Sequence, residues 1–209
     1  MKINLETMEK QFLGEWLFIK TADHYGDPDI IEFNNNTINH FGLEKNDGIS
    51  LNKIARNWIE KLTDLNIQFK NPNRIRILRK GKVYKVLSDN ESITEDCIFE
   101  DNYEKLIPTE TKLSEDEIQN LKFEFIWNNE KMTITFNEIL DKPYMQKINK
   151  KLNKQGHRIV LGNLNETLFL SIYDDIYIQN LLPIKYVDNT KIILYGFPKE
   201  PYEITCNVI

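Results

Sequence analysis

Apolar and polar residues alternate along much of the chain, and this two-residue period predicts β-strands. The stretch 27–41 is typical of a hairpin, with Ile31 and Phe33 on one face and a turn at Asn34-Asn35-Asn36. Further strands are expected over 66–88. There Pro72-Asn73 supplies one turn and Lys80-Gly81 is expected to close a tight hairpin.

The second half of the chain repeats this alternation. Residues 122–136 alternate around Asn128-Asn129, which predicts a hairpin with Phe123, Phe125 and Trp127 on one face. The stretch 157–197 adds about four or five strands separated by short polar turns. Strands so closely spaced pair antiparallel, because parallel pairs need long crossover connections.

A helical period appears in a few short segments. Leu5, Met8 and Phe12 mark one helix that ends at Gly14, and 50–62 predicts a second helix capped by Ser50. A third begins at Ser114, where Glu117 completes a capping box, and 141–155 is expected to form a fourth. We therefore expect a mainly β (α+β) protein, an antiparallel sheet or barrel with about three to four short helices.

The length of 209 residues suits one domain spanning 1–209. A faint internal echo indicates an alternative, in which 14–112 and 113–209 are two half-barrel-like repeats. Ordinary hairpin patterning explains the echo equally well.

Composition narrows the classes of function. The chain is 41% hydrophobic and 28% charged, as in folded globular proteins, and its net charge of −5 argues against nucleic-acid binding. The two cysteines form no metal pattern or disulfide framework. No apolar run reaches the ~20 residues of a membrane span. We expect a cytosolic protein, and the abundance of Asn, Lys and Ile favours a bacterial source.

Gly14-Glu15-Trp16 follows a short predicted helix and opens the first strand. In this it resembles the opening of lipocalin-type β-barrels, and the sequence around Tyr103 is similar to a second motif of that family. The resemblance implies a barrel whose closed end is plugged by Trp16 and whose interior holds a small hydrophobic ligand. Simple burial of Trp16 where the chain enters a sheet is the competing interpretation. Aromatic residues that would line or fill such a cavity are Trp16, Phe125, Trp127, Phe169 and Tyr173.

Charges separate into two neighbouring blocks. All the charged residues in 70–85 are basic, and all those in 89–104 are acidic. The two blocks either pair with each other across adjacent strands or leave an acidic surface that docks a basic partner. The acidic residues are Asp89, Glu91, Glu95, Asp96, Glu100, Asp101 and Glu104.

Motifs of known chemistry are missing from the sequence. It contains no glycine-rich phosphate loop, no Gly-x-Ser-x-Gly and no Cys-x-x-Cys, and its three histidines form no catalytic pattern. The best metal candidate is the loop holding Asp23, His24, Asp27 and Asp29. Turn formation explains those residues without a metal, so we predict no catalytic residues and no cofactor.

We therefore expect a non-enzymatic binding protein. An acidic, strand-rich chain without an evident active site is typical of an immunity protein or antitoxin that neutralises a toxin through its surface. The partner would then be a protein, such as a basic toxin, rather than nucleic acid or membrane. A lipocalin-like carrier of a small hydrophobic ligand is the alternative, and an enzyme using the 23–29 loop ranks third.

Overall fold

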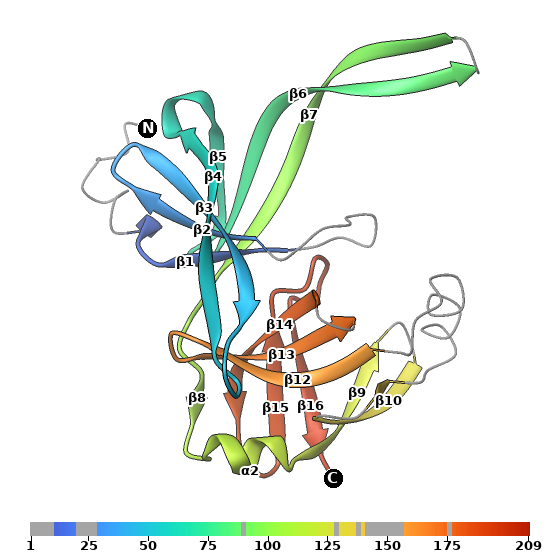
Figure 1. The fold of residues 1–209 in the computed structure, drawn as a ribbon. Coiled ribbons are helices and arrows are strands. Elements are labelled where there is room, and N and C mark those ends of the chain that lie inside the picture. Colours follow the sequence, from blue (N-terminus) through green and yellow to red (C-terminus); the bar gives the residue numbers. More distant parts are fainter. Residues whose placement is uncertain are drawn as a thin grey trace.

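The computed structural model describes residues 11–19, 29–88, 91–127, 130–136, 139–140, 157–174 and 177–209. It shows a mainly β protein, as the alternation predicts, built from two largely antiparallel sheets (Figure 1). The first sheet has the strand order β4-β3-β2-β1-β7-β6-β5. Its strands are β1 (Glu15–Phe18), β2 (Ile30–Asn34), β3 (Thr37–Lys45), β4 (Leu51–Lys61), β5 (Asn66–Asn71), β6 (Arg74–Ser88) and β7 (Glu91–Lys105).

The second sheet has the order β10-β9-β16-β15-β14-β13-β12-β11, and the short β8 pairs parallel with β14. Its strands turn through a large angle between β9 and β12, so the sheet curls into a half-barrel (Figure 1). These strands are β8 (Glu110–Thr111), β9 (Lys122–Trp127), β10 (Glu130–Thr135), β11 (Ile139–Leu140), β12 (His157–Leu164), β13 (Thr167–Asp174), β14 (Tyr177–Val187), β15 (Lys191–Tyr195) and β16 (Glu203–Val208).

Turn chemistry sets the hairpins where the sequence indicates them. Asn35 lies at φ 46° between β2 and β3, and asparagine tolerates this left-handed region better than most residues. Asn165 and Glu166 both have positive φ between β12 and β13, the backbone of a two-residue turn that matches strand twist. The predicted turn at 72–73 also connects two strands, β5 and β6.

Within the described residues the structure has fewer helices than the three to four expected. The helix α2 (Glu115–Gln119) begins at Ser114, whose side chain accepts from the Glu117 backbone while the Glu117 carboxylate accepts from the Ser114 backbone. This confirms the predicted capping box. A single turn of 3₁₀ helix, η1, spans Leu62–Asp64. The predicted helix over 141–155 and most of the one over 5–12 lie outside the described residues, although Gln11 and Phe12 are helical. No helix among the described residues is both long and apolar enough to cross a membrane.

Two predictions of local structure are wrong. The segment 50–62 forms the edge strand β4, not a helix, and pairs with β3 along its length. Its helix-like spacing arises because a bulge places extra residues between Ala55 and Ile59, and because an edge strand exposes apolar side chains such as Ile54 and Trp58. Pairing with β3 overrides the local preference.

The hairpin expected at Lys80-Gly81 is also absent. β6 runs straight through these residues, and Gly81 pairs with Cys97 of β7. A Cβ at Gly81 would overlap the Phe99 ring, which lies across the space that a side chain would fill. Here glycine permits close packing of an aromatic neighbour instead of forming a turn.

Three apolar clusters hold the body together. One fills the half-barrel around Phe123, Phe197 and Leu170. A second joins the two sheets, since Leu17 and Ile30 of the first pack with Phe169 of the second. The third covers the other face of the first sheet and contains Trp16, Ile31, Ile38, Ile75, Ile77 and Tyr103.

Candidate interaction surface

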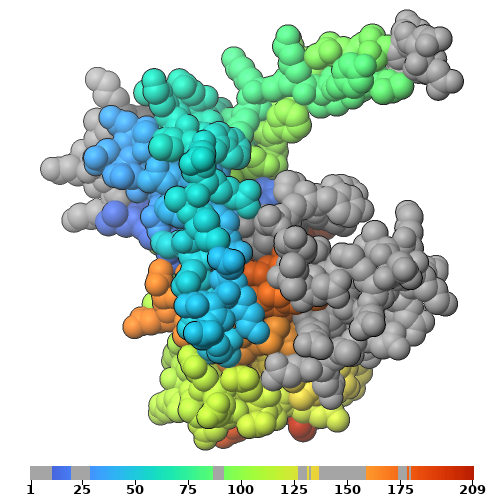
Figure 2. Space-filling model, viewed as in Figure 1, coloured from blue at the N-terminus to red at the C-terminus, as the bar shows by residue number. Residues whose placement is uncertain are grey.

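A long two-stranded ribbon leaves the first sheet and extends away from the body (Figures 1 and 2). β5 borders β6 only as far as Leu78, and β1 borders β7 only from Tyr103 onward. Beyond those points the two strands pair only with each other among the described residues. We call 80–88 and 91–100 the outer ribbon. At about 3.3 Å per residue its β6 strand is roughly 30 Å long.

The outer ribbon exposes large apolar side chains. Tyr84, Val86 and Ile98 are each about two-thirds exposed, at 67%, 68% and 67%. Ile93 and Phe99 are 38% and 45% exposed. Soluble proteins rarely leave so many large apolar groups together in water unless they serve as a contact surface.

The pairing register distributes these side chains between two faces. Residues directly opposite each other share a face, and Lys80 is opposite Ile98, Lys82 opposite Asp96, and Tyr84 opposite Thr94. The lysine face therefore carries Lys80, Lys82, Tyr84, Val86, Asp96 and Ile98. The opposite face, which we call the glycine face, carries Gly81, Val83, Lys85, Ile93, Glu95, Cys97 and Phe99.

The acidic block lies along β7 and is largely paired with the basic block on β6. Glu104 accepts from Arg74 at 2.6 Å, Glu100 pairs with Arg76 at 2.7 Å, and Glu95 pairs with Lys85. Asp101 pairs with Arg79. Of the other predicted acids, Asp89 and the Glu91 side chain lie outside the described residues.

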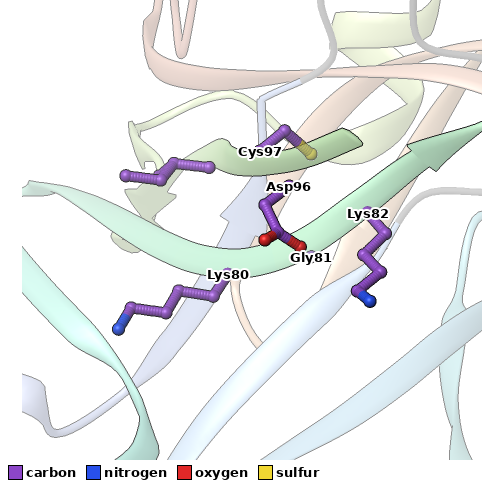
Figure 3. A pocket seen from close by; sticks show the side chains of 6 residues that line it. Lys80, Gly81, Lys82, Asp96 and Cys97 are labelled. Atoms are coloured by element: carbon purple, nitrogen blue, oxygen red, sulfur yellow. The ribbon is translucent and has the colours of Figure 1, made fainter. Parts of the chain in front are cut away.

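Three charged residues on the lysine face make no ion pair within the described part of the chain. Lys80, Lys82 and Asp96 line a shallow, open hollow together with Gly81, Cys97 and Ile98. Figure 3 shows the two lysine side chains extending from β6 on either side of Asp96. Among the described side chains of the outer ribbon, the uncompensated charge is thus a lysine pair beside one carboxylate.

A buried histidine network anchors the ribbon at its root. His40 on β3 is 1% exposed, and its ring nitrogens lie 2.9 Å from Asp29 Oδ2 and 2.8 Å from Glu60 Oε2. Arg79 donates from Nε and Nη2 to Glu60 of β4, each at 2.7 Å, and also binds Asp101 of β7. These bonds join β3 and β4 to the strands from which the outer ribbon extends.

Electrostatics keep this network charged. Burial alone would lower the pKa of His40, but hydrogen bonds to Asp29 and Glu60 outweigh it and raise the pKa above its ordinary value. Burial opposes the charge of Glu60 as well, yet Arg79 and His40 lower its pKa to about 2. The raised pKa of His40 favours the doubly protonated ring, whose two N–H groups can donate one hydrogen bond to Asp29 and one to Glu60. A ring engaged on both sides positions the strands and is not an available general base.

The predicted metal loop is only partly described. Asp23, His24 and Asp27 lie outside the described residues, and Asp29 binds His40 and contacts Arg56 at 3.7 Å. No group of three or more metal-binding side chains occurs within the described ranges. Asp29 therefore belongs to the histidine network.

The aromatic residues predicted to line a cavity are separated in the structure. Trp16 is fully buried among Phe33 and Phe69, and its Nε1 donates to the Phe12 carbonyl. Phe125 belongs to the half-barrel cluster, whereas Phe169 and Tyr173 belong to the cluster between the sheets. The Trp127 side chain is outside the described residues. The described members thus occupy three packed clusters instead of surrounding one cavity.

Sequence reasoning missed the ribbon and the role of His40. A signal for the ribbon was present, because Tyr84, Val86, Ile93, Ile98 and Phe99 stand among many charged residues. A strand buried on one face would concentrate such groups at alternate positions, whereas Ile98 and Phe99 are adjacent. His40 offers no comparable signal, since its partners are 11 and 20 residues away.

Comparison with known proteins adds no relative: no family model, curated protein or solved structure matches the chain.

Proposed function

We propose that this chain is a protein-binding protein and that the outer ribbon is its contact element. The observation that carries this proposal is the exposure of Tyr84, Val86 and Ile98 on one face of a ribbon that projects from the body. An isolated two-stranded ribbon is marginally stable in water, and a partner that covers its apolar face stabilises it. Aromatic and aliphatic side chains are common at protein interfaces, and here Lys82 and Asp96 lie between Ile98 and Tyr84 on the same face.

An immunity protein or antitoxin in the bacterial cytosol is the specific form of this function that we favour. Such a protein acts by covering its partner's site, and a projecting ribbon reaches into a concave site more readily than a flat sheet does. The acidic block attracts a basic partner only weakly, because bases of β6 already compensate Glu95, Glu100, Asp101 and Glu104. Contact is instead assigned to the apolar side chains and to the lysine face.

Site-specific photo-crosslinking tests the proposal. A photoreactive amino acid replaces Tyr84 in one variant and the exposed Lys112, next to α2, in a control variant. Both are produced in the cells that encode the chain and are irradiated there. We expect a discrete adduct with one protein at position 84 and none at 112.

The crosslinks also report failure. If position 84 yields no adduct, or only the diffuse background seen at position 112, the outer ribbon does not bind a protein. Native mass spectrometry of the purified chain addresses the carrier alternative, since a bound small molecule would appear as a defined mass increment.

A further inference from the structure

The outer ribbon has two unpaired edges within the described part of the chain. β6 loses its neighbour after Leu78, where β5 ends its pairing, and β7 gains its other neighbour only near Asn102. Such edges present rows of backbone N–H and C=O groups that accept an added strand. A partner strand of five or six residues spans ~17–20 Å, which fits within the outer ribbon.

Charge distinguishes the two edges. Lys80 and Lys82 on the β6 side make no ion pair with other described residues, and Lys85 is compensated by Glu95. On the β7 side Glu95 and Glu100 are both compensated, which leaves Asp96 among the side chains that the structure describes there. Lys80 and Lys82 therefore make the β6 edge positive, whereas Asp96 gives the β7 edge a negative charge.

A second copy of this chain that offers the same edge, as in a twofold dimer, is a poor occupant. Pairing two β6 edges about a twofold axis brings the unpaired Lys80 and Lys82 near the same lysines of the second copy. Pairing two β7 edges brings Asp96 near the Asp96 of the second copy. Like charges directly opposite each other destabilise a ladder, so edge charges of this kind act against self-association.

We propose that the β6 edge of the outer ribbon binds an extended acidic segment of the partner protein as an added strand. Side chains of the added strand alternate between the two faces of the ribbon. Those of the partner that lie next to Lys80 and Lys82 are therefore on the lysine face, and we expect them to be carboxylates. The partner side chains next to Gly81 and Val83 lie on the glycine face. We expect them to be small or apolar, because Gly81 and Val83 carry no charge. This inference rests on the proposed protein-binding function and assigns its partner chemistry.

Labelled peptides test the partner chemistry with the full chain. The probe is a ten-residue peptide of alternating Glu and Val, and its counterpart carries Lys in place of Glu. A third peptide has the acidic sequence with alternate backbone nitrogens methylated, which removes the N–H donors along one edge. Fluorescence anisotropy measures the Kd of each. We expect the acidic peptide to bind at least about tenfold more tightly than the basic one, and methylation to abolish binding.

Charge reversal locates the site. In K80E/K82E the acidic peptide loses about tenfold or more in affinity and the basic peptide gains. K112E/K122E, which reverses two exposed lysines away from the outer ribbon, is the matched control and is expected to bind like the wild-type chain. Circular dichroism verifies that both variants keep their strand content.

Three results would overturn the inference: tighter binding of the basic peptide, equal affinity for the methylated and unmethylated acidic peptides, or no detectable binding of any of the three peptides. Equal binding after methylation would show charge attraction without strand addition. None of these outcomes decides whether the outer ribbon binds a protein, because the crosslinks at position 84 measure that independently.

Discussion

The network that anchors the ribbon makes a quantitative prediction for His40→Phe. Phenylalanine preserves the stacking on Trp58, whose ring lies 4.2 Å from that of His40 at 12°, but donates no hydrogen bond. Asp29 and Glu60 then lose the cation between them. The change removes the imidazolium while it retains an aromatic ring of similar volume.

The magnitude follows from the two lost bonds. Each is a charge-assisted hydrogen bond worth about 1.5–3 kcal/mol. Part of this is recovered, because Glu60 keeps both bonds to Arg79 and the Asp29 side chain is 19% exposed to water. We therefore expect the free energy of unfolding to fall by about 3 kcal/mol near pH 6.

The pH dependence has a definite sign. The pKa of folded His40 is raised above its ordinary value of 6.5, so the folded state binds the proton more tightly than the unfolded chain. The stabilisation is complete below the unfolded pKa and is lost as the pH rises through the folded pKa. The difference in stability between wild type and His40→Phe should therefore shrink as the pH rises above 6.5 and through the raised folded pKa.

Urea denaturation at several pH values, followed by circular dichroism, measures that difference. Nuclear magnetic resonance of the imidazole provides the folded pKa directly. A difference that stays constant or grows with pH would refute the assignment, as would a folded pKa at or below 6.5.

Three further substitutions test the packing. Trp16→Ala removes a fully buried ring and should lower the unfolding free energy by about 3–5 kcal/mol in urea denaturation, whereas an effect below about 1 kcal/mol would contradict its place in the core. Gly81→Ala should cost about 1–3 kcal/mol because the new Cβ displaces Phe99, and the cost should be smaller in a Phe99→Ala background, as a double-mutant cycle measures. Arg74→Met should lower the unfolding free energy by about 3–5 kcal/mol, because it leaves the Glu104 carboxylate buried without a partner. Adding Glu104→Met should restore much of this loss. A double variant no more stable than the single one would contradict the role of this ion pair.

The sequence predicts most strands because alternation and turn chemistry are local. The hairpins at 34–37 and 164–167 are closed by turns that contain Asn35 and Asn165, and asparagine is a turn residue that can be identified in the sequence. The capping box at Ser114 is likewise contained within four residues. Where one short segment determines the structure, prediction from the sequence succeeds.

Segments governed by distant partners differ from what their local sequence predicts. β4 carries a helical spacing of apolar residues, but pairing with β3 and a bulge determine its structure. Lys80-Gly81 is typical of a turn, yet the Phe99 ring occupies the space where a Cβ of residue 81 would lie, and the strand continues through Gly81. In both cases the deciding contact lies outside the segment itself.

The candidate surface shows the same limit. Blocks of opposite charge on 70–85 and 89–104 are visible in the sequence, but the register decides which charges remain unpaired. That register pairs Arg76 with Glu100 and Lys85 with Glu95, and it leaves Lys80 and Lys82 without an ion pair among the described residues. Uncompensated charge therefore depends on strand pairing, which composition alone does not specify.

Hydrogen–deuterium exchange with the partner identified by crosslinking tests most directly whether the outer ribbon is the binding element. We predict that amides of 80–88 and 92–100 exchange more slowly in the complex, while those of β12 and β13 exchange at unchanged rates. Slower exchange confined to the second sheet, with an unchanged ribbon, would contradict it.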